Sequence, residues 1–400
     1  MRPVKFPGAS NLSLLTLVVG LLCGSAAAEW RPADPLRTVA RSPQGSVESL
    51  DAMLDAARKQ HNVPALGAIV FRADSVLARG IVGVRQSNAP TPVTLTDRFQ
   101  LGSNTKAMTA TLLATFVEEG KLAWTTTLAD VFPDRRDAMS ADFRGVTIDL
   151  LLSHHAGISA FEDTENKDFK SIPRLSGSPR EQRAAFTDWV LRGKPAGPIG
   201  KGLYSNGGYT VAGAVAERIG GESWESLMRI RVFKPLDLDG TFAWSDAPDI
   251  NQPWGHHETR NGSKPVNPLD PRERIPPIIW PGGSIELSLD DYARFLQINL
   301  RGLQGHDTQI LKAATIKHLH TSPVTPPDKY GLGWGLQDFD GAPASVHVGS
   351  AGTFYAVTII QPTRDLGAAV FVNAGAERAT AAGSDTVKAL IRRFAAPAGK

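Results

Sequence analysis

The sequence of 400 residues contains a single cysteine, Cys23. Without a second cysteine, the chain cannot form an internal disulfide. Cys23 lies in a segment that we expect to be removed, so the remaining chain would also lack a thiol nucleophile and any cysteine ligand for a metal. This is compatible with an oxidising compartment and excludes cysteine-based catalysis by the processed chain.

The sequence also lacks an excess of charge of one sign. It has 43 Lys and Arg against 40 Asp and Glu, a formal net charge of +3. Arg2 and Lys5 lie within residues 1–28, which hold no acidic residue, so the rest of the chain has a net charge of +1. No basic run with interleaved aromatic residues occurs, and we therefore predict no nucleic-acid partner.

Hydrophobic runs long enough to span a membrane are missing too. The apolar stretch from Leu12 to Gly24 is too short for a comfortable span, and it follows a basic start. Ala26-Ala27-Ala28 then offers small residues suited to signal peptidase. We predict a signal peptide at residues 1–28, a secreted or periplasmic protein, and no stable membrane span after cleavage. An uncleaved anchor is the alternative.

Hydrophobic periodicity predicts a mixed α/β (α+β) fold, in which helices flank an antiparallel β-sheet and an all-helical domain is inserted. The expected strands lie at 66–71, 80–84, 98–101, 345–348, 354–361 and 367–373. The expected helices lie at 46–59, 103–119, 148–152, 180–191, 209–219, 223–232, 289–300 and 384–394. The proline-rich segment 244–283 is expected to be a long surface excursion.

These elements suggest a division into domains. After an extended lead-in at 29–45, residues 46–125 and 275–400 would form a discontinuous sheet domain. Residues 126–274 would form the helical insertion with long loops.

Ser103-Asn104-Thr105-Lys106 begins one of the expected helices. All three residues before the lysine are ordinary helix caps, and Ser-x-x-Lys alone should occur about once by chance in such a chain. A capping box would place Glu or Gln at position 106, and the positive end of the helix disfavours a cation there. The same field, with burial, favours a neutral Lys106 that can accept a proton from Ser103 on the same helix face. We therefore predict a serine nucleophile with an activating lysine.

Tyr204-Ser205-Asn206 follows a Gly/Pro loop and is a second candidate. Tyr204 could shuttle a proton, although a phenol needs nearby cations to act as a base near neutral pH. Asn206 could donate to a substrate carbonyl. The structural alternative is a turn above a packed tyrosine.

His347-Val348-Gly349-Ser350 ends an expected strand whose edge could hold a peptide-like substrate. Gly349 would let backbones approach closely, and the Ser350 N–H could join the Ser103 N–H in an oxyanion hole. The structural alternative is a simple strand end and turn. His155-Ala156-Gly157 also fits His-x-Gly, but it precedes the tyrosine motif, and we assign it a structural role.

Ser-x-x-Lys, Tyr-x-Asn and His-x-Gly, in this order and at these separations, resemble the motifs of the penicillin-recognising serine hydrolases. That group includes class C β-lactamases, serine D,D-peptidases and related esterases. The resemblance spans residues 46–395 and includes Phe99–Ser103, Gly120–Leu122, Ile148–Ile158, Gly208–Leu236 and Gly282-Gly283 followed by Asp290. It implies the same fold, the nucleophile Ser103, its activating Lys106 and the shuttle Tyr204. It also implies a substrate-binding role for Asn206, His347, Gly349 and Ser350.

The resemblance further implies a serine hydrolase that cleaves an amide, ester or lactam through an acyl-enzyme. Together with the predicted signal peptide, this makes an exported enzyme, and we expect no metal and no cofactor. His347 occupies a position where many members have Lys, and a histidine is mostly neutral near pH 7. This disfavours an efficient β-lactamase. A β-lactam, a D-amino-acid peptide and a small ester all stay open as substrates, as do the true β-lactamase and D,D-peptidase activities.

Two readings from other classes compete with this one. A non-catalytic penicillin- or peptidoglycan-binding module would have lost part of the serine, lysine and tyrosine set, which is complete here. A metal hydrolase would have to use the histidines at 154–155, 256–257 or 318 and 320, and no His-Glu-x-x-His pattern supports it. The Gly-x-Ser-x-Gly motif that marks the nucleophile of α/β-hydrolases is also absent, so nothing in the sequence favours that class.

Overall fold

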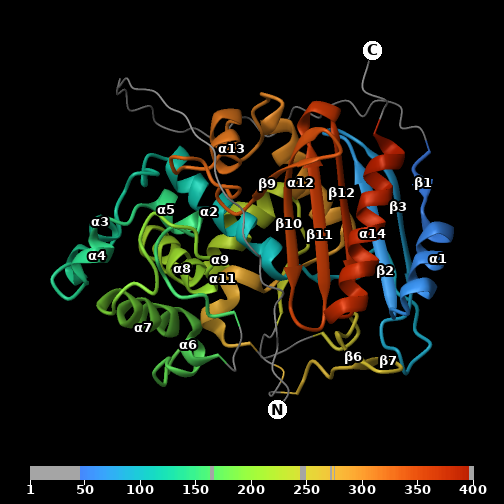
Figure 1. Ribbon diagram of the computed structural model, residues 1–400, viewed down its shortest axis with the longest axis horizontal. Helices are drawn as coiled ribbons and strands as arrows, with labels where there is room; N and C mark the ends of the chain where they lie inside the picture. Colours follow the sequence, from blue (N-terminus) through green and yellow to red (C-terminus); the bar gives the residue numbers. More distant parts are fainter. Residues whose placement is uncertain (1–45, 163–165, 244–248, 271–272, 274, 396–400) are drawn as a thin grey trace.

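The computed structural model describes residues 46–162, 166–243, 249–270, 273 and 275–395. The predicted signal peptide and lead-in therefore lie outside the described residues. A β-sheet with helices packed on it stands beside a group of helices (Figure 1). The predicted mixed α/β fold with an antiparallel sheet is confirmed.

The main sheet has seven strands in the order β1-β3-β2-β12-β11-β10-β9. Neighbours are antiparallel except for the short β1, which runs parallel to β3. Pairing of β2 with β12 joins the two ends of the chain in one sheet. The strands are β1 (Glu48–Ser49), β2 (Ala65–Phe71), β3 (Val76–Gly83), β9 (Gly335–Phe339), β10 (Ala342–Ser350), β11 (Tyr355–Gln361) and β12 (Leu366–Val372).

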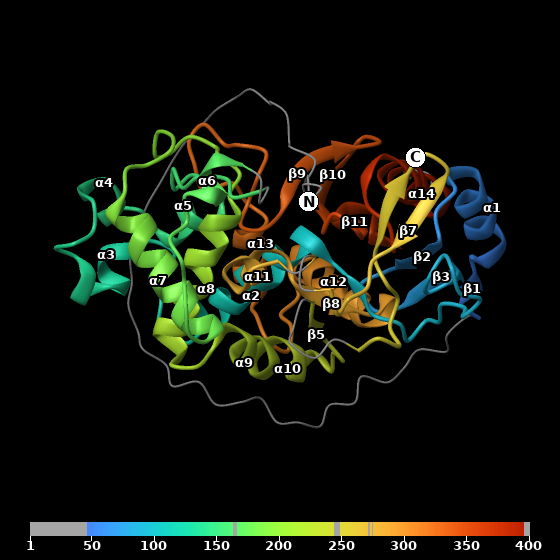
Figure 2. The same cartoon turned by 90° about the horizontal axis from the view of Figure 1, so that it is seen from below.

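Both faces of this sheet are covered. Helices α1 (Asp51–His61) and α14 (Ala376–Phe394) pack on one face, and α12 (Leu289–Leu303) packs on the other (Figures 1 and 2). Strands β2, β11 and β12 are consequently buried along their whole length, which explains their continuous apolar sequences. Helix α14 begins eight residues before the helix expected at 384.

Helix α2 (Thr105–Glu118) lies between the sheet and the helical half, and it follows a 3-10 turn, η1 (Gly102–Asn104). Every residue from Thr105 to Phe116 is buried, so this is a core helix rather than an amphipathic one. The helices that follow are α3 (Leu128–Val131), α4 (Ala141–Arg144), α5 (Ile148–Leu152), α6 (Lys167–Lys170), α7 (Pro179–Arg192), α8 (Asn206–Gly220), α9 (Trp224–Met228), a π-helical turn (Arg229–Phe233) and α10 (Lys234–Leu236). Helix α13 (Ala313–Leu319) packs against α12.

The segment expected to be a long excursion contains regular structure. A hairpin, β6 (His256–Thr259) and β7 (Gly262–Pro265), packs against α14. The buried His256 ring fixes it: Nδ1 lies 2.6 Å from the Asn373 carbonyl, and the Ser87 N–H donates to Nε2 at 2.9 Å. The range 126–274, expected as a helical insertion, therefore includes a hairpin that lies against the sheet domain.

A second small sheet and a turn complete this part of the chain. Strands β4 (Phe99–Gln100), β8 (Ile285–Leu287) and β5 (Thr241–Phe242) form the sheet, in that order. The turn η5 (Pro277–Ile279) and helix α11 (Trp280–Gly283) pack against α8. Strand β4 leads directly into the 3-10 turn that carries Ser103.

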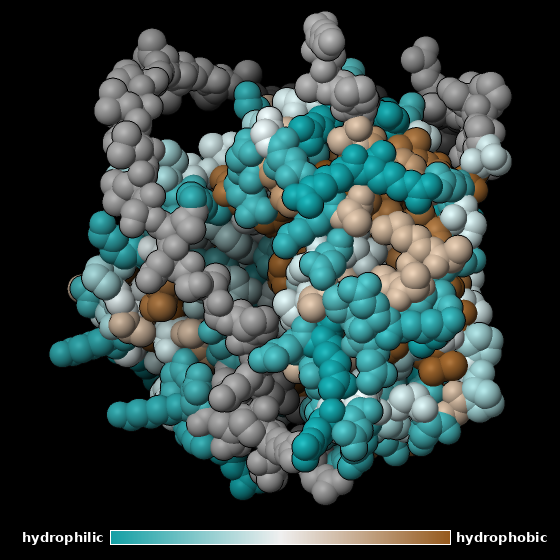
Figure 3. Space-filling view, turned by 45° about the vertical axis from the view of Figure 1, so that its right-hand side comes forward, coloured by the Kyte–Doolittle hydropathy of each residue, from teal (hydrophilic) through white to brown (hydrophobic). Residues whose placement is uncertain are grey.

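The outer face shown in Figure 3 is mostly hydrophilic, with small apolar areas between polar ones. Across the part of the chain that the structure describes, no helix combines the length and the apolar character that crossing a membrane requires.

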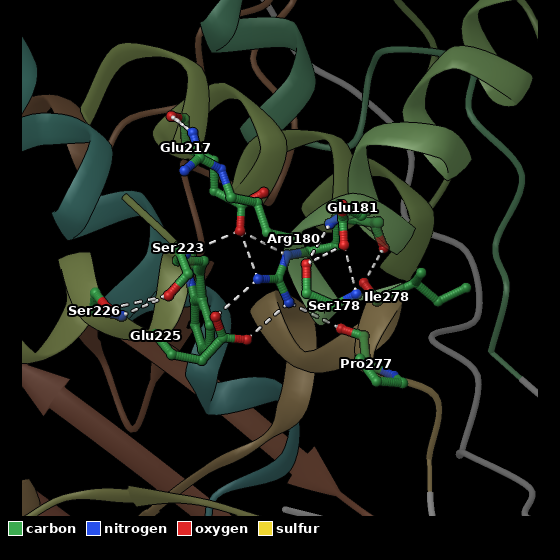
Figure 4. Close-up of polar contacts among 12 residues, drawn as sticks. Ser178, Arg180, Glu181, Glu217, Ser223, Glu225, Ser226, Pro277 and Ile278 are labelled. Carbon is green, nitrogen blue, oxygen red and sulfur yellow. Dashed lines mark hydrogen bonds and ion pairs between the residues drawn. The ribbon is translucent and has the colours of Figure 1, made fainter. Parts of the chain in front are cut away.

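A buried ion-pair network holds the helical half together. Arg183 of α7 is fully buried and bonds to Glu217 of α8 and to Glu225 of α9. It also donates to the Pro277 carbonyl at 3.2 Å, and Figure 4 shows Glu217, Glu225 and Pro277 converging on this point. The Trp224 N–H adds a further bond to Glu217. The network therefore ties three helices to the turn η5.

We expect Arg183→Ala to lower the free energy of unfolding by about 3–5 kcal/mol, because it leaves buried carboxylates without their cation. Urea unfolding followed by circular dichroism measures this loss. Arg180→Ala is the matched control: Arg180 is exposed on the same helix, and we expect a loss below about 1 kcal/mol. Equal losses in the two variants would contradict the assignment.

Candidate active site

Ser103 is the second residue of the 3-10 turn η1, not a helix cap. Its Oγ lies 3.1 Å from the Nζ of Lys106. Asn104 fixes the turn, since its Nδ2 donates to the carbonyls of Leu101 and Ala356 at 3.0 and 3.2 Å, and Tyr292 donates to its Oδ1 at 3.0 Å. The serine is thus held between the main sheet and α12.

Lys106 is fully buried, and its amine has three polar neighbours. Besides Ser103, it donates to the Asn206 Oδ1 at 2.7 Å and to the Gly282 carbonyl at 2.8 Å. Both of these oxygens can only accept. A neutral amine has two hydrogens and one lone pair, so if the hydrogens go to these oxygens, the lone pair is left for the Ser103 hydroxyl.

The electrostatics of Lys106 favour that neutral form. Burial lowers the pKa of the Lys106 amine to about 7, and the nearby Glu162 carboxylate opposes this shift. A substantial fraction of the amine is therefore unprotonated near neutral pH. The sequence argument from burial at a helix start expected this direction.

Tyr204 lies above the same amine, with its ring centre 4.8 Å from the Nζ of Lys106. Burial raises the pKa of the Tyr204 phenol above its usual value, and a hydrogen bond with Ser103 opposes the shift. A phenol that acts as a base near neutral pH needs the opposite shift. Tyr204 is therefore protonated near neutral pH, which suits it to donate a proton and not to act as the base.

Asn206 is the first residue of α8, and both the oxygen and the nitrogen of its side-chain amide form hydrogen bonds. Its Oδ1 accepts from Lys106, and its Nδ2 donates to the Phe161 carbonyl at 3.2 Å. The second bond fixes which way the amide points. Asn206 therefore links Lys106 to the loop at Phe161, and one amide hydrogen is left for any substrate carbonyl.

The end of β10 brings His347, Gly349 and Ser350 to the turn that carries Ser103. A side chain on Gly102, whose φ is +52°, would meet the Ser350 nitrogen at 2.7 Å. A Cβ on Gly349 would lie 1.9 Å from the Leu101 carbonyl oxygen. The backbone of β10 therefore packs directly on the turn that carries Ser103.

His347 forms one wall of this region. Its Nδ1 lies 3.0 Å from the Val348 carbonyl, and the Tyr330 hydroxyl lies 2.9 Å from its Nε2. Since Nδ1 must donate to the carbonyl, Nε2 accepts from Tyr330 in the neutral ring. Burial lowers the pKa of His347 to about 3, and charge on Lys106 acts in the same direction. The ring is neutral at physiological pH.

Sequence reasoning missed four contributors to this site: Glu162, Tyr330, His154 and the Gly282 carbonyl. His154 was considered only as a metal ligand, although the segment Ile148–Ile158 that contains it resembles the family, as does Gly282-Gly283. No local signal points to Tyr330. The neighbouring His155 lies 3.0 Å from Ser153 Oγ and 3.3 Å from an Asp328 oxygen, contacts that fit the structural role assigned to it.

The histidines considered as metal ligands have separate partners. His256 bonds to the backbone, and His257 lies 3.0 Å from Glu273. His318 lies 2.7 Å from Asp149, and His320 contacts Ser345 and Asn299. Among the described residues, no group of three or more His, Cys, Asp and Glu side chains is placed to hold a metal ion.

Comparison with known proteins matches most of the chain. A family model described as Beta-lactamase matches residues 50–392. Penicillin-binding protein 4 of Amycolatopsis lactamdurans is 29% identical over 350 residues, which cover 85% of this chain and 88% of that protein.

Solved structures agree with the fold. The octameric penicillin-binding protein homologue from Pyrococcus abyssi aligns with a TM-score of 0.67 and 21% identity, covering 85% of this chain and 76% of that one. The D-amino acid amidase from Ochrobactrum anthropi SV3, solved with L-phenylalanine amide, aligns with a TM-score of 0.65 and 19% identity. That alignment covers 84% of this chain and 97% of the amidase. At these identities, the two alignments support the fold alone.

Substitution of Gly349 tests whether the close contact between β10 and the turn at Ser103 is needed for activity. Gly349→Ala should push β10 away from the nucleophile turn and lower kcat/KM at least about 100-fold, because misplacement by about 1 Å has that effect. Ester hydrolysis measures the loss. Gly145→Ala is the control, since a Cβ there meets nothing within 4 Å. Full activity of the Gly349 variant would show that the contact does not fix the site.

Proposed function

Because the chain belongs to the Beta-lactamase family of serine hydrolases, we propose that it is an exported enzyme that cleaves an amide, ester or lactam through an acyl-enzyme on Ser103. The observation that carries this proposal is the hydrogen bonding of Lys106. Two acceptor-only oxygens take its hydrogens when it is neutral, and its lone pair then faces the Ser103 hydroxyl.

In the acylation step, the Ser103 oxygen forms a bond to the substrate carbonyl carbon as its proton moves to the Lys106 nitrogen. The N–H groups of Ser103 and Ser350 receive the developing oxyanion. The close packing of Gly102 on the Ser350 nitrogen supports this pairing. Collapse of the tetrahedral intermediate then breaks the bond between the carbonyl carbon and the leaving group.

In this mechanism, Tyr204 is the acid that protonates the leaving group. Its phenol stays protonated, so it gives a proton to the departing nitrogen or oxygen and regains one from the Lys106 ammonium. The two side chains act as a coupled pair, and water reverses the sequence to release the acid product. The ring of Tyr204 lies close enough to Lys106 to support this exchange.

The substrate is held along β10. Strand β9 pairs with β10 only as far as Val346, so among the described residues no strand covers the other edge of His347–Ser350. An extended peptide-like substrate can add to this edge as a further strand. Asn206 offers its remaining amide hydrogen to a carbonyl of the same substrate.

Charge at the site favours uncharged or amine-bearing substrates over those with a carboxylate near the scissile bond. His347 is neutral at physiological pH, so it offers no positive charge to a substrate carboxylate. Burial raises the pKa of the nearby Glu162 carboxyl group, and Lys106 opposes this shift. We therefore propose small esters and D-amino-acid amides or peptides as substrates ahead of β-lactams.

A substrate panel tests the proposal. A short-chain aryl ester and a D-amino-acid amide should turn over faster than a D-Ala-D-Ala peptide or a chromogenic cephalosporin, both of which carry a carboxylate near the scissile bond. Intact-protein mass spectra should show an acyl adduct on the wild-type protein and none on Ser103→Ala, which should lose turnover altogether. Full turnover by Ser103→Ala would contradict the nucleophile, and an adduct without turnover would indicate a binding module.

The pH profile tests the role of Lys106. Since neutral amine is needed, kcat/KM for an uncharged ester should rise as the pH increases through about 7. Glu162→Gln removes the carboxylate that raises the pKa of Lys106, so the midpoint should move to lower pH. Measuring both profiles with the same ester gives the shift, and a midpoint that stays or rises contradicts the assignment to Lys106.

A further inference from the structure

We propose that His154 is a positioning residue that holds Tyr204 in place for proton transfer at Ser103; this role rests on the function proposed above. His154 binds the backbone on both sides of the tyrosine. The Leu203 N–H donates to the His154 carbonyl at 2.8 Å, and the Ser205 N–H donates to its Nδ1 at 3.1 Å. One residue therefore takes the two N–H groups that flank Tyr204.

The imidazole also packs on the tyrosine itself. The ring centres of His154 and Tyr204 lie 4.3 Å apart. Tyr330 and Tyr209 lie 4.7 and 5.4 Å from the same imidazole, so three of the five tyrosines in the chain surround it. Backbone bonds and ring packing together fix both the main chain and the side chain of Tyr204.

The hydrogen bonding of His154 departs from what a purely structural histidine would show. Because Nδ1 accepts the Ser205 N–H, the proton of the neutral ring is on Nε2. That nitrogen is buried and has no hydrogen-bond partner among the described residues. By contrast, the buried His256 has a partner at each ring nitrogen. Buried polar groups without partners are rare, and they concentrate where function requires a particular arrangement.

The backbone at His154 is strained as well. Its φ is +67°, just after α5 ends, where glycine or asparagine normally closes a helix. This conformation lets the carbonyl and the ring of one residue both face the segment from Leu203 to Ser205. Strain of this kind persists where surrounding contacts impose it, and it is common near active sites.

The neutral state of His154 is protected by its surroundings. Burial lowers the pKa of His154 well below its usual range, and the positive charge of protonated Lys106 acts in the same direction. The Nδ1 lone pair therefore stays available to the Ser205 N–H across the working pH range. His154 acts through Tyr204 and does not itself exchange the proton.

Two variants separate positioning from simple packing. His154→Ala removes both the Nδ1 acceptor and the ring, and we expect kcat for ester hydrolysis to fall about 100-fold with KM changed less than about threefold. His154→Asn keeps an acceptor near Nδ1 and tolerates the positive φ, so it should recover at least about tenfold in kcat. If His154→Ala does not fold, the asparagine variant still tests the proposal by its retained kcat.

Hydrogen exchange gives a readout that does not depend on activity. The Ser205 amide, whose acceptor is Nδ1, should exchange faster in His154→Ala and stay protected in His154→Asn and Ser103→Ala. The Leu203 amide bonds to the backbone carbonyl of residue 154, which every variant keeps, and serves as an internal reference. His256→Ala is the matched control, because its ring also accepts a backbone N–H, that of Ser87, but bonds to neither Ser103 nor Tyr204; it should keep kcat within about twofold.

Three results would overturn the proposal: full kcat in His154→Ala, unchanged exchange at Ser205, or no recovery by asparagine. Turnover by Ser103→Ala would instead overturn the catalytic assignment and leave the exchange result standing.

Discussion

The site depends on the hydrogen bonds of the buried Lys106 amine. The amine joins α2 to α8 through Asn206 and to α11 through the Gly282 carbonyl, so three elements from different parts of the chain meet at one nitrogen. Burial lowers its pKa from 10.5 to about 7. A shift of this size corresponds to about 5 kcal/mol of disfavour for the charged form. That is a large fraction of the stability of an ordinary domain, and the fully buried helix α2 offsets it with apolar contacts.

The same desolvation acts on every titratable neighbour of Lys106, and the results differ by group. It keeps the phenols protonated and the imidazoles neutral, since burial always disfavours the charged form. Burial acts on the Lys106 amine in the same sense and lowers its pKa to about 7. The surrounding tyrosine and histidine side chains are therefore uncharged, whereas the Lys106 amine changes charge in the physiological pH range. This arrangement is what the proposed role of Lys106 as a base requires, because a lysine is ordinarily protonated at this pH.

The sequence revealed part of this site because a local rule was broken. Lys106 stands where a helix start prefers an acid, and that misplaced charge drew attention to Ser103 independently of any resemblance. His154 gave no comparable signal: its partners lie about fifty residues further along the chain, and its positive φ is set by them. The Gly282 acceptor is a backbone carbonyl, which composition cannot identify. Similarly, the β6–β7 hairpin lacks a strong alternating pattern in the sequence. Its position is fixed by long-range hydrogen bonds of His256, which a sequence pattern does not reveal.

The site lies where the two halves of the molecule meet, and this has a consequence for catalysis. Ser103 and Lys106 are fixed by the sheet side through Asn104, whereas Tyr204 and Asn206 come from the start of α8. Helix α8 is anchored at its other end by the bond from Arg183 to Glu217. A displacement of α8 would move Asn206 and Tyr204 together, and Asn206 would resist it through its bond to Lys106. Within the part of the chain that the structure describes, the hydrogen bond from Tyr204 to the sheet side is the one with Ser103. His154 follows α5 in the same half as Tyr204, so its bonds to Leu203 and Ser205 fix Tyr204 to α5. Its ring also contacts Tyr330, which bonds to His347, and this contact connects the unit to β10.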